Sequence, residues 1–352
     1  MVLCPGSRSA PLALAAGGLA ERGLLTLTTA IDERSAAFHA LGMAAASGRA
    51  VAVITTSGTA VANLLPAAVE ADRSALPLLL LTADRPQRLK NCGANQTVNQ
   101  EDFLESVCRA FMTGPIDGLH RLSQTQLQSL ANKVWEQTLQ HPGPVHLNLP
   151  FEEPLHPSRD DQQQAWSSWD FAVNQQRQLR RPTASVAALP TDGFDWSRPG
   201  VVVAGPWRGL ESDKPAYQQA LRALAECSGW PMLADQLAAI PADLPNLIRH
   251  WELLLPQCLP AAEAGLQVLR LGPLPASRRL ESWLRSLGSG QLLISEGEPR
   301  CLDPLGLSRQ CSSGLVAWWN AISTDACFSR SGSRALLTAW AEADAQVQRV
   351  LD

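Results

Sequence analysis

Short apolar segments alternate with longer mixed segments over the first 150 residues. The pattern predicts strands at 2–6, 24–32, 50–57, 76–83 and 143–150. It predicts helices at 10–23, 35–48, 59–74, 102–111 and 125–140. Short buried strands separated by helices are typical of βα units, in which helices cover both faces of a parallel sheet. We therefore expect an α/β fold.

The pattern breaks off at residues 157–197, which are rich in Gln, Ser, Arg and Pro and lack periodicity. Such a composition is typical of a linker. Alternation resumes afterwards, with strands expected at 200–206, 230–235, 264–272 and 291–298 and helices at 214–229, 277–290 and 333–352. We predict a first α/β domain at 1–156, a linker at 157–197 and a smaller second α/β domain at 198–352.

Composition narrows the class of protein. The 352 residues carry a net charge of −4, which does not favour a nucleic-acid surface. Only Lys90, Lys133 and Lys214 are lysines, so an anion site would be built from arginine. The eight cysteines form no CxxC pair and the six histidines show no ligand spacing. We expect no disulfide framework and no metal site, and a reducing cytoplasm as the location. No apolar run is long enough to span a bilayer, and no signal peptide is visible.

Ligands of open parallel sheets bind outside the carboxyl ends of the strands, and the first such end is followed by "CPGSRSAPL". Gly6 permits a tight turn, Ser9 is a candidate helix cap and Pro11 suits the first helical turn. The amides near Ser7 and the guanidinium of Arg8 then form a candidate carboxylate or phosphate site. The alternative is an ordinary turn with a solvated Arg8.

The second strand end is followed by "DER", in which Glu33 leaves a strand with apolar neighbours. Burial there would raise the pKa of Glu33 toward that of a proton donor working near neutral pH. The alternative is that Asp32 or Glu33 caps the next helix while Arg34 pairs at the surface. Composition alone favours this alternative.

The third strand end carries Ser57, Gly58 and Thr59, small residues that let a ligand approach the backbone closely. The segment lacks the lysine and the glycine spacing of a P-loop. The alternative is a cap followed by a core helix.

The fourth strand end places Arg85 before a proline, and Gln96 follows in a turn that we expect to face the same crevice. The alternative is a loop whose polar groups bond to each other. Arg8 and Arg85 at two ends of one sheet nevertheless indicate a substrate with more than one carboxylate.

Six segments in this order resemble one family. They are "CPGSRSAPL", "DERSAAFHALG", "TSGTAVANLLPAAVEA", "LTADRPQRL", "CGANQTVNQ" and "GPVHLNLPFEEPL". Together they resemble the amino-terminal part of the 2-succinyl-5-enolpyruvyl-6-hydroxy-3-cyclohexene-1-carboxylate synthases. These are thiamine-diphosphate enzymes of menaquinone and phylloquinone biosynthesis. The likeness spans most of residues 2–155. It weakens from 198 onward, where "PASRRLESW" resembles a basic segment of the family.

The resemblance implies a pyrimidine-binding domain followed by a central domain. It implies a transferase that decarboxylates 2-oxoglutarate and adds the remaining unit to isochorismate, using thiamine diphosphate and Mg²⁺ in a homodimer or tetramer. Glu33 matches the glutamate that bonds the aminopyrimidine ring, and Ser57, Gly58 and Thr59 are assigned to the cofactor with it. The residues assigned to isochorismate are Ser7, Arg8, Arg85, Gln96, Arg278 and Arg279.

The sequence departs from the family in two respects: its amino end lacks the family's usual first helix, and the motif of a further domain is missing. The Gly-Asp-Gly motif and later Asn of the family's diphosphate-binding domain are not found. We therefore expect a partial sequence that lacks this domain, holds half a cofactor site and no metal ligands, and is inactive alone. Two alternatives stay open: another thiamine-dependent 2-oxo-acid carboligase, or a non-catalytic binding or regulatory module.

Overall fold

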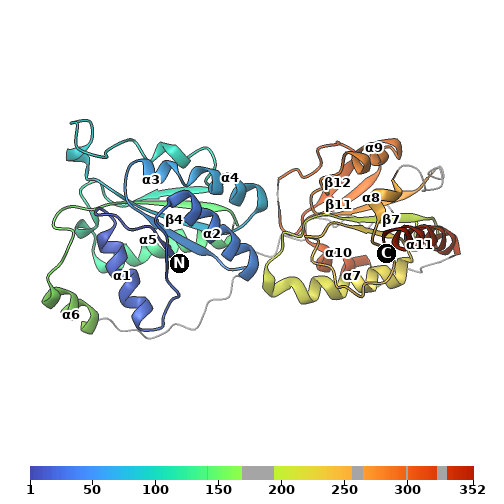
Figure 1. The fold of residues 1–352 in the computed structure, drawn as a ribbon, viewed down its shortest axis with the longest axis horizontal. Helices are drawn as coiled ribbons and strands as arrows, with labels where there is room; N and C mark the ends of the chain where they lie inside the picture. The colour runs from blue at the N-terminus through green and yellow to red at the C-terminus, as the bar shows by residue number, and fades with distance from the viewer. Residues whose placement is uncertain (141, 169–193, 256–264, 299, 323–330) are drawn as a thin grey trace. The chain divides into compact units, whose positions relative to one another are not determined.

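The computed structural model describes residues 1–140, 142–168, 194–255, 265–298, 300–322 and 331–352 (Figure 1). The chain divides into two compact units, Met1–Arg181 and Pro182–Asp352, and each is described by itself. The division falls inside the predicted linker. That segment begins with a helix, α6 (Arg159–Ser168), and its residues 169–193 lie outside the described residues.

The first unit is a six-stranded sheet in the order β2-β1-β3-β4-β6-β5, with every pairing parallel. Its strands are β1 (Val2–Leu3), β2 (Thr28–Thr29), β3 (Val51–Thr55), β4 (Leu78–Asp84), β5 (Ala110–Thr113) and β6 (Pro144–Pro150). Its other helices are α1 (Ala10–Glu21), α2 (Glu33–Ser47), α3 (Thr59–Ala62), α4 (Leu65–Ser74) and α5 (Gln124–Gln140). The parallel α/β fold predicted for this unit is confirmed.

Alternation along β4 divides the core of this unit between the two faces of the sheet. Leu78 and Leu80 pack with α2 and α4, whose buried residues at this face are mostly alanines. Leu79 and Leu81 pack on the opposite face, against α1 and α5. Small alanines let α2 and α4 lie close to the sheet. Since α1 and α5 pack on the opposite face, both faces of the sheet are covered (Figure 1).

One predicted helix of this unit is wrong, and another is divided in two. The segment 102–111 forms a short 3-10 helix, Asp102–Leu104, and then strand β5, because the residues from Ala110 pair in parallel with β6. The segment 59–74 is two helices, because Pro66, in the first turn of α4, offers no amide N–H to continue α3.

The second unit is also a six-stranded parallel sheet, in the order β12-β11-β10-β7-β8-β9. Its strands are β7 (Gly200–Ala204), β8 (Met232–Ala234), β9 (Leu247–Ile248), β10 (Gln267–Leu271), β11 (Gln291–Ile294) and β12 (Ser308–Cys311). Its helices are α7 (Lys214–Ser228), α8 (Trp251–Leu254), α9 (Arg278–Ser286), α10 (Leu315–Ile322) and α11 (Ser331–Leu351). The sequence pattern missed β9, β12, α8 and α10, because they are short and β12 is polar.

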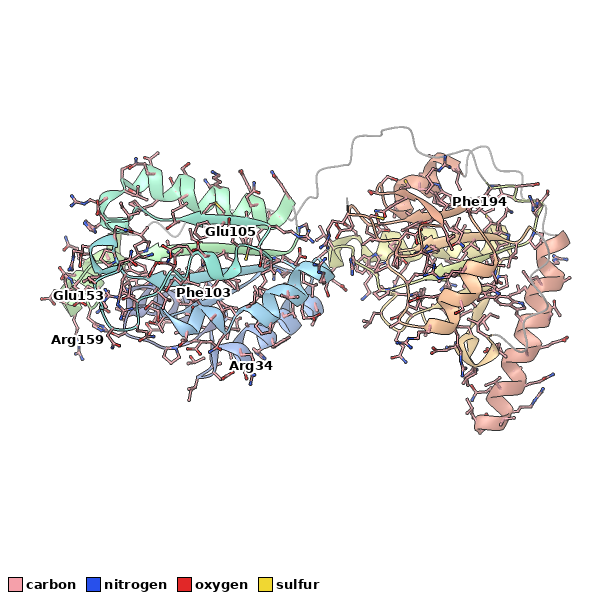
Figure 2. All side chains as sticks on the ribbon, turned by 90° about the horizontal axis from the view of Figure 1, so that it is seen from above. Arg34, Phe103, Glu105, Glu153, Arg159 and Phe194 are labelled. Carbon is pink, nitrogen blue, oxygen red and sulfur yellow. The ribbon has the colours of Figure 1, made fainter. Side chains whose placement is uncertain are left out.

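Aromatic residues fill one face of this second sheet. Phe194, labelled in Figure 2, packs edge-on against Trp230 at 5.4 Å between ring centroids and against Trp318 at 6.4 Å. Trp196 stacks on Trp230 at 5.1 Å.

Across the described part of the chain, no helix combines the length and the apolar character needed to cross a membrane.

Candidate functional site

The sheet order of the first unit brings the four predicted segments to one edge. The chain runs from β1 outward to β2, then returns to β3 and β4 on the other side of β1. The carboxyl ends of β1 and β3 therefore flank the point where the strand order reverses, where open α/β sheets bind ligands. Gly6–Arg8 follows β1, Glu33 follows β2, Ser57–Thr59 follows β3 and Arg85 follows β4.

Arg85, Ser57 and Gln96 contact one another directly. One guanidinium nitrogen of Arg85 donates to the hydroxyl of Ser57, and the same nitrogen donates to the backbone carbonyl of Gln96 at 2.8 Å. The side-chain amide of Gln96 donates to the carbonyl of Ser57 at 2.8 Å. The side-chain amide of Gln96 is therefore engaged with the backbone, although its residue is exposed.

Arg8 is 7% exposed and is held by the segment after β6. It donates to the carbonyl of Phe151 at 3.0 Å and to the carboxylate of Glu153 at 3.3 Å. Its Nε is buried without a hydrogen-bond partner among the described residues. The Glu153 side chain is 63% exposed, as Figure 2 shows at the surface of this unit. The solvated Arg8 of the alternative interpretation is not found.

The two arginines influence each other. Burial first, and then the positive charge of Arg8, lower the pKa of Arg85, while Asp84 and Glu153 act in the opposite direction. Two like charges that repel each other favour an anion bound nearby. Among the described residues, Arg85 uses only one of its nitrogens as a side-chain donor, so its remaining N–H groups are available.

Asp32 and Glu33 play different structural parts. Asp32 caps α2, its carboxylate accepting the amide of Ser35 at 2.7 Å, and this hydrogen bond lowers the pKa of Asp32. The capping alternative is therefore confirmed for Asp32 and wrong for Glu33. Glu33 begins α2, is partly buried, and accepts from the side-chain amide of Asn63 at 3.3 Å. The burial expected for Glu33 is therefore found only in part.

The charge of Glu33 reaches the end of β1. The pKa of the Cys4 thiol rises to about 12, through burial first and then through the negative charges of Glu33 and Asp32. Among the described residues the Glu33 carboxylate has one polar partner, the neutral amide of Asn63. Arg34 is exposed and makes no ion pair with either neighbour in the described structure. Glu33 is thus a carboxylate without a cation of its own.

Glycine is required at two of the turns. A Cβ on Gly6 would overlap the side chain of Thr56. Gly58 has φ +82°, and a Cβ there would lie 2.7 Å from the Cγ of Gln96. These close approaches explain why small residues follow β1 and β3.

The remaining predicted residues at this edge of the sheet are Ser7, Ser9 and Thr59. Ser7 and Thr59 are exposed, and Thr59 begins α3. Ser9 makes no side-chain cap: its hydroxyl donates to the carbonyl of Gly6 at 3.0 Å. The capping role expected for Ser9 is therefore wrong, whereas Pro11 does lie in the first turn of α1 as expected.

A buried polar network behind these turns was missed by the sequence analysis. Gln100, Asn148, Thr82 and Asp84 are each 0% exposed. Asn148 accepts from Thr82 at 2.9 Å and from Gln100 at 2.8 Å, and donates to Asp84 at 2.8 Å. Lys90 pairs with Asp84 at 2.8 Å. The available signal in β6 was the pair of polar residues His146 and Asn148 among its apolar neighbours.

Arg278 and Arg279 belong to the second unit. Both are exposed in the first turn of α9, which Ser277 caps through the amide of Leu280 at 3.2 Å. Arg279 donates to the carbonyl of Glu252 at 3.3 Å. Their assignment to the substrate stays a prediction.

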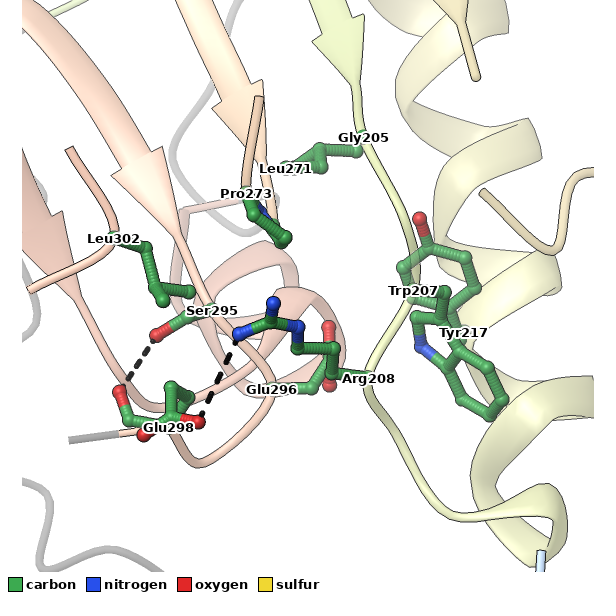
Figure 3. Close-up of a pocket in the computed structure, with 11 residues that line it drawn as sticks. Gly205, Trp207, Arg208, Tyr217, Leu271, Pro273, Ser295, Glu296, Glu298 and Leu302 are labelled. Carbon is green, nitrogen blue, oxygen red and sulfur yellow. Dashed lines mark hydrogen bonds and ion pairs between the residues drawn. The ribbon is translucent and has the colours of Figure 1, made fainter. Parts of the chain in front are cut away.

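The second unit has a pocket at the corresponding edge of its own sheet (Figure 3). Gly205, Leu271 and Ser295, which line it, lie at or just beyond the ends of β7, β10 and β11. Arg208 lies 4.0 Å from the carboxylate of Glu298, which is also paired with Arg300 at 2.8 Å. Within the described residues, no group of three or more His, Cys, Asp or Glu side chains is arranged to hold a metal ion.

Comparison with known proteins identifies the class. Residues 1–104 match the family described as thiamine pyrophosphate enzyme, N-terminal TPP binding domain. The edge described above lies largely within this match. Over residues 1–104 the first unit is therefore similar to the N-terminal domain of thiamine pyrophosphate enzymes.

The relatives narrow the class further. The chain is 70% identical over 323 residues to the 2-succinyl-5-enolpyruvyl-6-hydroxy-3-cyclohexene-1-carboxylate synthase of Synechococcus sp. (strain WH7803), covering 91% of this chain and 55% of that one. It is 56% identical over 365 residues to the enzyme of the same name from Prochlorococcus marinus (strain MIT 9313), covering 100% and 62%. The chain is therefore similar to these synthases over nearly all of its length, and it spans a little over half the length of the curated relatives it matches.

Proposed function

We propose that this chain forms the pyrimidine-binding and central domains of a 2-succinyl-5-enolpyruvyl-6-hydroxy-3-cyclohexene-1-carboxylate synthase. The enzyme would decarboxylate 2-oxoglutarate and transfer the remaining four-carbon unit to isochorismate, in menaquinone or phylloquinone biosynthesis in the cytoplasm. One observation carries the proposal. Glu33, a carboxylate without a cationic partner among the described residues, lies at the same sheet edge as the arginine pair.

The residues at this edge fit the aminopyrimidine half of thiamine diphosphate. Glu33 would hydrogen-bond the ring nitrogen, since among the described residues its carboxylate is engaged only by the weak contact to Asn63. The turn Ser57–Thr59 would lie against the ring, with Thr59 exposed at the start of α3. Bound thiamine diphosphate supplies a nucleophilic carbon and an electron sink for decarboxylation.

The diphosphate requires a cation, and we propose Mg²⁺ in that position. The described residues of this chain offer no cluster of three candidate ligands. We place the ligands in the part of the relatives' length that this chain does not match.

Arginine chemistry supports dicarboxylate substrates. Arg8 and Arg85 retain N–H donors and lie close enough for one to lower the pKa of the other. A carboxylate bound between them would relieve that repulsion through charge-assisted hydrogen bonds. We assign both to isochorismate, together with Ser7 and Gln96 at this edge and Arg278 and Arg279 of the second unit.

Exposed apolar side chains near Glu33 support assembly as a homodimer or tetramer. Ile31 is 89% exposed, Phe38 42% and Leu65 36%. Ile31 precedes the cap of α2, Phe38 lies on α2, and Leu65 follows the Asn63 that bonds Glu33. We propose that a diphosphate-binding domain of a partner subunit covers them, closing the cofactor site.

A chimera tests the proposal. This chain replaces the matching segment of the Synechococcus WH7803 relative, and the product is assayed with isochorismate, 2-oxoglutarate, thiamine diphosphate and Mg²⁺. Product formation comparable to that of the parent enzyme is expected. A folded chimera that binds thiamine diphosphate without turnover would favour a binding module, and turnover with a different acceptor or 2-oxo acid would favour another carboligase.

A further inference from the structure

Gln100 has no part in the proposed site, yet it is 0% exposed and every side-chain group of it is engaged. Its Oε1 accepts the backbone amide of Gly58 at 2.9 Å. Its Nε2 donates to the carbonyl of Ala83 at 3.0 Å and to the Oδ1 of Asn148 at 2.8 Å. One side chain thus joins the carboxyl ends of β3, β4 and β6.

The backbone amide of Gly58, which donates to Gln100, is buried and requires a hydrogen-bond acceptor. Gly58 is buried and has φ +82° and ψ −138°, a backbone conformation that only glycine adopts readily. A buried amide left without an acceptor is costly, so an acceptor must be supplied from elsewhere in the fold. Gln100 supplies it from a loop 42 residues away in sequence.

The loop that carries Gln100 also binds the carbonyl group of the Ser57–Gly58 peptide. Gln96 donates its side-chain amide to the carbonyl of Ser57 at 2.8 Å, while Gln100 accepts the N–H of Gly58. The Ser57–Gly58 peptide is therefore gripped at both its C=O and its N–H by two glutamines four residues apart. Arg85 is tied to this clamp, because one of its nitrogens donates to both the Ser57 hydroxyl and the Gln96 carbonyl.

The clamp has a rigid base. Asn148, which accepts from Gln100, also accepts from Thr82 at 2.9 Å and donates to Asp84 at 2.8 Å. These groups are buried in the middle strands of the sheet. Movement of Gln100 would break bonds in this network, so the clamp fixes the turn relative to the sheet.

We propose that Gln100 is a positioning residue of the synthase site. It holds the Ser57–Gly58 peptide and thereby fixes the direction in which Arg85 presents its free N–H groups to a substrate carboxylate. The inference rests on the proposed function for the identity of that substrate, isochorismate. Gln100 itself touches no substrate.

The first test needs no catalysis. Amide hydrogen exchange of Gly58 is measured by NMR in the 352-residue chain and in Gln100→Met, which keeps the side-chain length and removes both hydrogen-bonding groups. We expect Gly58 exchange to accelerate at least roughly tenfold, the factor that one buried hydrogen bond corresponds to. Asn99→Ala, an exposed neighbour, is the control and should leave this rate unchanged. Equal protection of Gly58 in Gln100→Met would overturn the clamp.

The second test separates positioning from stability. In the chimera saturated with thiamine diphosphate, so that any weaker cofactor binding by the turn is overcome, Gln100→Met should raise the KM for isochorismate roughly tenfold or more, while 2-oxoglutarate decarboxylation assayed without isochorismate keeps its rate. A parallel loss in both measurements would show a merely structural role. An inactive unmodified chimera would contradict the proposed function, but it would not affect the result of the Gly58 exchange experiment.

Gln100→Glu keeps the inference testable if Gln100→Met fails to fold. Glutamate retains the acceptor for Gly58, but its ionised form faces the carbonyl of Ala83 and the Oδ1 of Asn148. Burial raises the pKa of such a carboxyl, and the protonated form again donates. We expect the KM for isochorismate, relative to that of the unmodified chimera, to fall toward normal as the pH is lowered. A ratio independent of pH would contradict the proposal.

Discussion

The guanidinium of Arg85 donates to the hydroxyl of Ser57, a side chain that is 0% exposed at the end of the neighbouring strand. The contact joins β3 to β4 across the sheet edge and leaves the other nitrogens of Arg85 without partners among the described residues. The residue proposed to bind substrate is thus fixed by the turn proposed to bind cofactor. Substitution of either residue should therefore alter the position of the other side chain.

Arg85→Lys is expected to impair the use of isochorismate. A lysine ammonium can reach one acceptor, but it cannot serve Ser57, Gln96 and a carboxylate in the planar arrangement of a guanidinium. We expect the KM for isochorismate in the chimera to rise roughly ten- to a hundredfold, equivalent to the loss of one or two charge-assisted hydrogen bonds. Arg88→Lys is the matched control, since Arg88 is exposed and pairs with Glu152. A loss confined to 2-oxoglutarate decarboxylation would show that Arg85 is assigned to the wrong substrate.

Lys90→Met is expected to destabilise the first unit. The Lys90 ammonium is 8% exposed and pairs with the fully buried Asp84. Although burial acts to lower the pKa of Lys90, hydrogen bonds to Asp84 and Glu101 raise it above its usual value. Removing one partner of a buried pair costs about 3–5 kcal/mol in free energy of unfolding, because the other charge remains.

Urea unfolding of the chain at neutral pH measures this loss, with Lys133→Met on the exposed surface of α5 as the control. Equal midpoints for the two variants would show that Asp84 does not depend on Lys90.

His146 should make stability depend on pH. Burial lowers the pKa of His146 to about 4, from an ordinary value of 6.5, although Glu101 opposes the change. The unfolded chain therefore takes up a proton at higher pH than the folded chain does. Stability contributed by the neutral ring is complete above pH 6.5 and is lost progressively as the pH falls toward 4.

A shift of this size corresponds to about 3 kcal/mol at most. His146→Gln should show a smaller decrease in free energy of unfolding between pH 7 and pH 4.5 than the unmodified chain does, measured by urea titration. His39→Gln, an exposed control, should behave like the unmodified chain. Identical pH dependence of all three would remove His146 as the cause.

Gly58→Ala should damage the turn after β3. The φ of +82° disfavours alanine, and its Cβ would lie 2.7 Å from the Gln96 side chain. We expect a loss of about 1–3 kcal/mol in free energy of unfolding and weaker binding of thiamine diphosphate to the chimera. Gly17→Ala is the matched control: its Cβ would meet nothing within 4 Å in α1, so a gain of about 0.5–1 kcal/mol is expected. Calorimetry of both variants distinguishes strain from a general effect of adding a methyl group.

The sequence predicted the α/β class and the polar residues at the strand ends, because these signals are local. Arg8, Glu33, Ser57 and Arg85 each follow a short apolar run, and a parallel sheet gathers such ends at one edge. The clamp formed by Gln100 was missed, because its partners are 17 to 48 residues away and nothing local marks the glutamine as buried.

Strand β5 shows the same limit. Its four residues, Ala110–Thr113, follow a segment with helical periodicity and become a strand only by pairing with β6. The different structural roles of Asp32 and Glu33 could not be predicted from the sequence either, since either carboxylate suits a helix cap by composition. Short-range patterns therefore predicted the residues of the candidate site, while long-range contacts determine how these residues are held.

The central claim is that the Glu33 carboxylate acts on the aminopyrimidine of the cofactor. Asp32→Asn is the control for it, because asparagine still caps α2 while the neighbouring charge changes. Both variants should keep the fold, as judged by circular dichroism and thermal unfolding.

The most direct measurement is the rate of deuterium exchange at the thiazolium C2 of thiamine diphosphate bound to the chimera, followed by quenched-flow NMR. Glu33→Gln is predicted to slow this exchange by about 10²–10⁴-fold, the usual worth of a positioned acid–base group, while Asp32→Asn leaves it within a few fold of normal. An unchanged exchange rate in Glu33→Gln, with the cofactor bound, would contradict the role of Glu33.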